Sequence, residues 1–166
     1  FSAEKTQIMH FSRSRSAKPF LEMPGIPGLP NKAETVIKIL GIHLDYRLTW
    51  ANHIAYVRRL LAKAGAKMRR LSPISGSTWG PPLIQLRQLY ITCIRPMLSY
   101  ACAVWFVLTT ADARCKWTLT AQLLKQLEIE DSKWLRQISG AFTRTSGDVL
   151  CKELFVEKIS VYLAHR

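Results

Sequence analysis

The stretch that decides the fold is Ile39-Leu40-Gly41-Ile42-His43-Leu44-Asp45, which is followed closely by Leu48-Thr49-Trp50 and His53-Ile54. Residues 36–44 are apolar and rich in β-branched side chains, a composition that favours a strand. Gly41 indicates a bulge in that strand or a place where another backbone approaches closely. Beyond it, apolar residues recur at helical spacing, so we expect a short strand that turns directly into a helix.

The expected helix begins near Thr49, a residue type that is favourable as an N-cap. Its apolar residues recur every three or four positions and form one stripe, made of Ile54, Val57, Leu61, Ala64, Met68 and Leu71. At about 100° per residue, a separate face collects positive charge. The candidates for contact with nucleic-acid phosphates are Arg58, Arg59, Lys63, Lys67, Arg69 and Arg70. The alternative is an ordinary solvated helix face.

Upstream of this region, Thr6–Phe11 alternates polar and apolar residues and is expected to form a strand that pairs with Val36–Leu44. Between them, the proline- and glycine-rich Pro24–Pro30 predicts a surface connection. A small β-hairpin at the N-terminus is therefore expected.

Downstream, further helices are expected, so the predicted fold class is mainly α. One helix should start at Pro81-Pro82 and be kinked or ended by Pro96, and others should cover 98–108 and 118–138. Gly140 is a natural helix stop and Ser146 a natural cap for a short last helix, with a helical tail after Lys158. The aromatic residues Trp50, Trp105 and Trp134, together with His53, are assigned to the core.

The charge of the chain points to a polyanionic partner. The net charge is +13, and residues 1–80 carry 13 of the 24 Lys and Arg residues but only 4 of the 11 Asp and Glu residues. Neutralising phosphates releases condensed counterions, so nucleic acid is the default partner. No membrane partner is expected, because the uncharged run at 96–111 is shorter than the roughly 20 residues that cross a bilayer.

The cysteines predict neither a metal site nor a disulfide framework. They are Cys93, Cys102, Cys115 and Cys151, with no C-x-x-C pair and no histidine at ligand spacing. Reduced thiols buried in helices are expected, which fits the nucleus or cytoplasm rather than secretion. No signal peptide is visible and the first residue is not Met, so we expect the chain to be part of a longer protein.

Four sequence motifs follow one another along the chain: Phe1–Phe11, Ile39–Asp45, Ile94–Tyr100 with Val104-Trp105, and Leu135–Phe142. Together they resemble the reverse transcriptase of a non-LTR (LINE-type) retrotransposon, over nearly the whole chain but only the back end of that enzyme. The resemblance implies that residues 1–48 form the edge of a polymerase palm (motifs D and E). Residues 49–166 would form a helical thumb bundle and the start of the following connection.

The resemblance also assigns roles to individual residues. Lys5 matches the motif D lysine near the incoming triphosphate, where a cation or proton donor would ease departure of pyrophosphate. Leu40 and Gly41 match motif E, the primer grip. The competing interpretations are an ordinary surface lysine and a plain β-bulge. The implied partners are an RNA template, an RNA–DNA or DNA duplex and the remainder of the parent polymerase.

Catalysis by this chain alone is not expected. Nucleotidyl transfer needs carboxylates that hold two Mg²⁺ ions, and the sequence contains no Asp-Asp pair, so the magnesium ions belong to the full-length enzyme and no cofactor is expected in this fragment. The acidic residues Glu128, Glu130 and Asp131 are interpreted as a solvated helix face. An alternative reading of the whole chain is a stand-alone basic helical module that binds nucleic acid or protein and has no enzymatic role.

Overall fold

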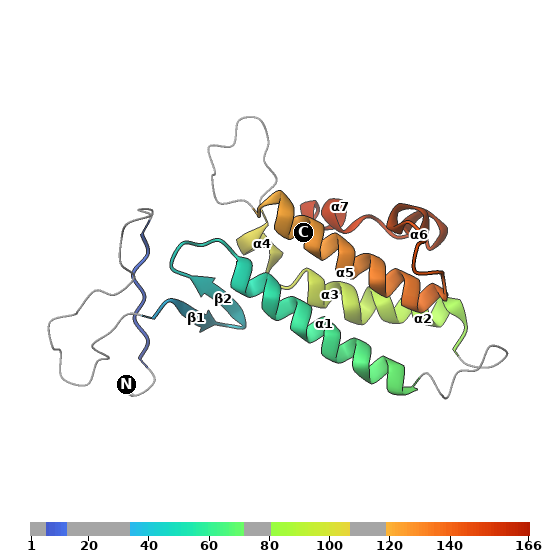
Figure 1. The fold of residues 1–166 in the computed structure, drawn as a ribbon, viewed down its shortest axis with the longest axis horizontal. Helices are drawn as coiled ribbons and strands as arrows, with labels where there is room; N and C mark the ends of the chain where they lie inside the picture. Colours follow the sequence, from blue (N-terminus) through green and yellow to red (C-terminus); the bar gives the residue numbers. More distant parts are fainter. Residues whose placement is uncertain (1–5, 13–33, 72–80, 107–118) are drawn as a thin grey trace, which may run out of the picture. The chain divides into compact units, whose positions relative to one another are not determined.

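The computed structural model of the chain describes residues 6–12, 34–71, 81–106 and 119–166, with the side chains of 68–71 outside the description (Figure 1). The expected fold class is confirmed at the level of its elements, since the described residues are mainly helical, with one two-stranded antiparallel sheet near the N-terminus. The chain divides into two compact units, Phe1–His53 and Ile54–Arg166. The expected connection at Pro24–Pro30 lies outside the described residues.

The β-hairpin lies within one of the two strands that we expected to pair. Strand β1 (Val36–Ile39) pairs antiparallel with β2 (Ile42–Asp45), with Val36 opposite Asp45 and Ile39 opposite Ile42. The predicted pairing of Thr6–Phe11 with Val36–Leu44 is therefore wrong. Leu40 and Gly41 take positive φ values of 49° and 84°, the signature of a two-residue hairpin turn that reverses the chain. Residues 6–12 are not a strand, although the Glu34 amide donates to the Ile8 carbonyl at 2.7 Å.

A buried carboxylate shapes the link between the hairpin and the first helix. Asp45 accepts hydrogen bonds from the Arg47 amide at 2.9 Å, from the Thr49 amide at 2.9 Å and from the Thr49 hydroxyl. Helix α1 (Ala51–Leu71) begins two residues after Thr49, whose hydroxyl is engaged with Asp45. The expected long helix is confirmed, and Ile54, Val57 and Leu61 of its apolar stripe are buried.

The second helical stretch contains a wide turn. Helix α2 (Leu83–Leu89) continues into the π-helix η3 (Tyr90–Ile94) and then into α3 (Arg95–Leu98). Pro96 lacks an amide donor and its ring crowds the carbonyl four residues earlier, which disfavours a regular α-helical turn immediately before it. Pro96 therefore follows a wide turn and does not end the helix. The short helix α4 (Cys102–Trp105) comes next, within the stretch expected at 98–108.

The C-terminal elements follow the predicted caps. Helix α5 (Ala121–Ser139) ends at Gly140, which has a φ of 65°, a left-handed conformation that glycine adopts without strain. Helix α6 (Gly147–Glu153) begins after Ser146, whose hydroxyl accepts the Asp148 amide, and α7 (Ile159–Ala164) forms the helical tail. Figure 1 shows α5, α6 and α7 in orange to red, and α5 and α6 pack against each other.

The predicted core residues are buried. Trp50 and His53 are buried, as are Trp105 and Trp134 in the helical unit. The cysteine prediction is only partly right. Cys102 and Cys151 are buried and free, Cys93 is exposed and free, and Cys115 lies outside the described residues.

We predict that Gly147→Ala lowers the free energy of unfolding by about 1–3 kcal/mol, the usual cost of overpacking. A Cβ at Gly147 would overlap Ser132 Oγ and lie 3.1 Å from Ser132 Cβ. Urea denaturation of single and double variants measures this. Because Ser132→Ala removes the overlapping oxygen, Gly147→Ala should cost less in that background. Equal costs in both backgrounds would contradict the packing argument.

Candidate nucleic-acid interface

The basic residues of α1 form a row on the outer side of the helix. Arg59, Lys63 and Lys67 are all exposed, and each follows the last by four residues, so the three lie on one helix face. Residues 51–71 contain no Asp or Glu. This face is therefore a continuous cationic ridge, which we call the basic row.

Arg58 lies next to the basic row but points toward α5. Its Nε lies 3.2 Å from Glu130 Oε1, and its Nη1 donates to Gln126 Oε1 at 3.3 Å. The Arg58 side chain is 43% exposed and that of Glu130 14%. Its positive charge is partly balanced by Glu130, so it is less available to a phosphate than the three residues of the row.

Three predicted site residues cannot be placed by the structure. Lys5 and the side chains of Arg69 and Arg70 lie outside the described residues. Their assigned roles stay predictions.

The hairpin turn presents an apolar side chain to solvent. Leu40, at the tip, is 86% exposed and holds a positive φ, a conformation that costs a non-glycine residue about 1–2 kcal/mol. Phe155, with a φ of 49° and 85% exposure, has the same combination, so this geometry alone does not single out Leu40 and Gly41, whose primer-grip role stays a prediction.

Among the acidic residues of α5, the interpretation as a solvated face holds for Glu128 and is wrong for Asp131. Glu128 is exposed, but Asp131 is only 3% exposed and accepts a hydrogen bond from the Tyr90 hydroxyl. A sequence signal for this existed, because Asp131 falls in register with the buried Leu127, Trp134 and Leu135. We missed it because we assigned the carboxylate by charge and not by helical position.

Asp131 belongs to a buried polar cluster centred on Arg95. The Arg95 Nε donates to the Tyr90 hydroxyl at 3.3 Å, and its Nη2 donates to the Glu157 carbonyl. The guanidinium carbon lies 4.5 Å from the centre of the Tyr162 ring and 5.5 Å from that of Tyr90. These contacts surround a buried cation with a hydroxyl, a carbonyl and two aromatic faces, and the hydroxyl links it to the Asp131 carboxylate.

Burial governs the acid–base properties of this cluster. Desolvation raises the pKa of Asp131 to about 6, a shift that the Tyr90 hydrogen bond and the charge of Arg95 oppose and that Glu128 reinforces. Burial also raises the pKa of Tyr90 well above its usual value, and the charge of Asp131 adds to this. The thiol of Cys151 has a raised pKa, chiefly because it is desolvated. At neutral pH the thiol is therefore protonated and a weak nucleophile.

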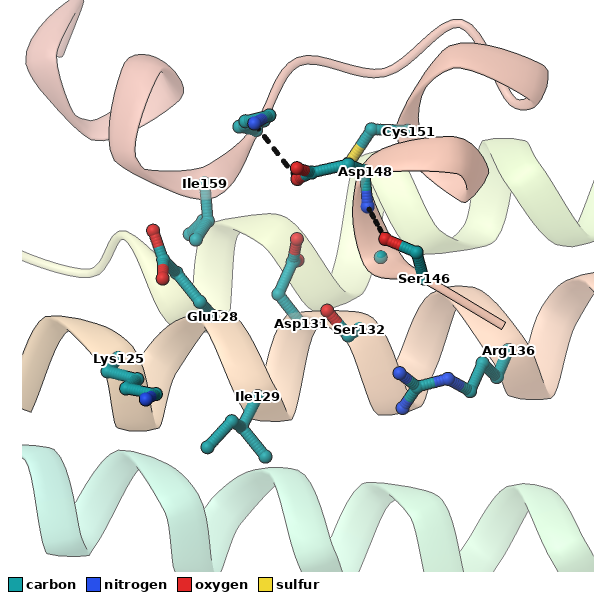
Figure 2. A pocket seen from close by; sticks show the side chains of 12 residues that line it. Lys125, Glu128, Ile129, Asp131, Ser132, Arg136, Ser146, Asp148, Cys151 and Ile159 are labelled. Carbon is teal, nitrogen blue, oxygen red and sulfur yellow. Dashed lines mark hydrogen bonds and ion pairs between the residues drawn. The ribbon is translucent and has the colours of Figure 1, made fainter. Parts of the chain in front are cut away.

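A pocket of about 410 Å³ opens beside Asp131, between α5 and α6 (Figure 2). Figure 2 shows Glu128 and Asp131 projecting from the side of α5 on which Asp148 of α6 and Ile159 of α7 lie. Both signs of charge line it, and the Asp148 carboxylate pairs with Lys158 Nζ at 2.9 Å. In the described part of the chain no group of three or more His, Cys, Asp or Glu side chains could hold a metal ion. Asp131 is paired with Tyr90 and Asp148 with Lys158, so the basic row is the better candidate for an interface.

Comparisons of the chain with models of protein families, with curated proteins and with solved structures found no match. Among the described helices, none is long and apolar enough to cross a membrane.

We predict that Asp131 makes the protein less stable as the pH rises. Its pKa is about 6 when folded and near 3.8 when unfolded, so the folded state binds the proton more tightly. The stabilisation is complete below pH 3.8 and is lost as the pH rises through about 6. Relative to Asp131→Asn, the free energy of unfolding of the unmodified chain should fall by about 2–3 kcal/mol between pH 4 and 7. Glu153→Gln, which removes an exposed carboxylate of α6 that does not contribute to the pKa of Asp131, is the control. Parallel stability curves for the unmodified chain and Asp131→Asn would contradict the assignment.

We predict that Leu40→Asn stabilises the hairpin by about 0.5–1 kcal/mol, because asparagine tolerates positive φ at the first position of such a turn. Amide hydrogen exchange of β1 and β2 measures the change. Ile39→Asn, one residue earlier in the strand, should have the opposite effect. Faster exchange in Leu40→Asn would show that the leucine side chain stabilises the turn.

Proposed function

We propose that this chain is the C-terminal palm edge and thumb of a reverse transcriptase of the non-LTR retrotransposon type, and that it grips the template–primer duplex. The proposal combines the motif resemblance with the net charge of +13 and with the exposed basic row. The observation that carries it is the row itself, in which Arg59, Lys63 and Lys67 stand exposed on a helix without a single acidic residue.

The spacing of the row suits a phosphate backbone. Residues four apart rise by about 6 Å along a helix axis, so successive cationic groups can meet successive phosphates. Contacts of this kind position a duplex without reading its sequence. A wide, shallow A-form minor groove also favours recognition by shape. The row therefore supports binding that is indifferent to sequence, as a copying enzyme requires.

The hairpin supports the same proposal. Leu40 and Gly41, which the resemblance assigns to motif E, form a tight two-residue turn, and the Leu40 side chain is exposed. A glycine without a side chain permits a sugar or phosphate to approach the main chain closely. Primer-end contact is thus the role that we assign to this turn.

Nucleotide addition is not assigned to this chain. Its acidic residues do not fit a two-metal centre, because the sequence has no Asp-Asp pair and Asp131 is committed to Tyr90. Catalysis belongs to the remainder of the parent enzyme in this proposal, and the magnesium ions with it.

We predict that Lys63→Glu/Lys67→Glu weakens binding to an RNA–DNA hybrid by more than tenfold and lowers the slope of log affinity against log salt by about 2. Fluorescence anisotropy over a salt series measures both quantities. The matched control is Lys125→Glu/Lys152→Glu, which makes the same change in net charge at exposed positions of α5 and α6. Circular dichroism verifies folding. An equal loss in both double variants would show that net charge, and not the basic row, drives binding, and the proposed interface would fail.

A further inference from the structure

A groove runs alongside the basic row, with walls from two helices. It has a volume of about 500 Å³, and its walls come from α1 and from Met97 of α3. The described lining residues are Leu60, Lys63, Ala64, Ala66, Lys67 and Met97. The groove therefore shares two lysines with the basic row, but its other lining residues do not belong to the row.

The floor of the groove is apolar. Leu60, Ala64, Ala66 and Met97 supply aliphatic and thioether surface, and Met97 is 38% exposed. Methionine adapts its shape to a partner, which suits a binding surface. An apolar hollow of this size is best filled by apolar side chains of a ligand. Phosphates and base edges are polar and would make no favourable contacts with these walls.

The rim of the groove is cationic only. Lys63 and Lys67 are its charged side chains among the described lining residues, and Arg59 continues the row one turn earlier. No Asp or Glu occurs in residues 51–71 to balance them. A ligand that fills the floor should therefore carry negative charge beside its apolar groups.

We propose that this groove binds an acidic amphipathic helix of a protein partner. Apolar side chains at i, i+3, i+4 and i+7 of the partner fill the floor, and flanking carboxylates meet Lys63 and Lys67. This goes beyond duplex binding, because a peptide held there occupies the lysines that we assign to phosphates. Only this competition rests on the proposed function; the peptide site stands without it.

The experiment uses a fluorescein-labelled synthetic peptide with leucines at those positions and glutamates beside them, titrated with the full chain. Ala64→Leu fills the floor and keeps both lysines, so it should weaken peptide binding at least tenfold and leave hybrid binding unchanged. Ala164→Leu makes the same substitution at an exposed position of α7, outside both the groove and the basic row, and should change neither. A poly-glutamate peptide of equal charge separates simple charge attraction from docking.

Each result bears on one proposal or the other. Tight peptide binding that Ala64→Leu abolishes supports the groove, even if the chain fails to bind the hybrid. Absence of peptide binding, or equal binding of poly-glutamate, overturns the inference while hybrid binding stands. If Ala64→Leu weakens hybrid and peptide alike, the groove belongs to the nucleic acid and the inference is wrong.

Discussion

The helical unit depends on keeping one buried cation satisfied. Arg95 is 5% exposed, and an unpaired charge at that depth would cost several kcal/mol. Its partners come from three places in the chain: Tyr90 one wide turn earlier, Asp131 on α5 acting through the Tyr90 hydroxyl, and the Glu157 carbonyl before α7. Arg87 of α2 acts in the same way, donating to the Leu154 carbonyl at 2.6 Å and the Phe155 carbonyl at 3.0 Å. Two arginines of one helical stretch thus donate hydrogen bonds to main-chain carbonyls of the segment between α6 and α7. The packing of the C-terminal elements therefore depends on these side-chain to backbone hydrogen bonds as well as on apolar contacts.

The π-turn makes that arrangement possible. Residues five apart in an α-helix lie about 140° from each other around the axis, which would direct Tyr90 and Arg95 to different faces. In η3 the Arg95 amide donates to the Tyr90 carbonyl, and the wider turn brings the two side chains into hydrogen-bond contact. Pro96, which follows at once, disfavours a regular turn here. The π-turn therefore accommodates the proline in the backbone and also supplies the hydrogen bond that the buried arginine requires.

Helical periodicity and capping chemistry predicted most of the helical unit. The stripe of α1, the stop at Gly140 and the cap at Ser146 each rest on contacts within one turn, which neighbouring residues determine. The errors arose where distant partners decide the outcome. Leu40 carries the positive φ that turn rules reserve for asparagine or glycine, so the hairpin was sought between more distant strands. Asp131 was assigned to solvent because its partners, Tyr90 and Arg95, lie far away in sequence. The roles of Lys5, Arg69 and Arg70 stay predictions.

The two faces of α1 allow a single helix to be both part of the scaffold and the interface that we propose. Burying Ile54, Val57 and Leu61 fixes the helix in its unit and places every cation of the basic row in water, where a charge costs little and remains available. Such a row gives affinity that depends on salt and ignores sequence, so by itself it cannot choose among polyanions. The apolar groove beside Lys63 and Lys67 adds a second criterion, because only a ligand with apolar groups at the right spacing gains from it. If both proposals hold, selectivity on this surface resides in the alanines and Met97, and the lysines supply the attraction common to every anionic ligand.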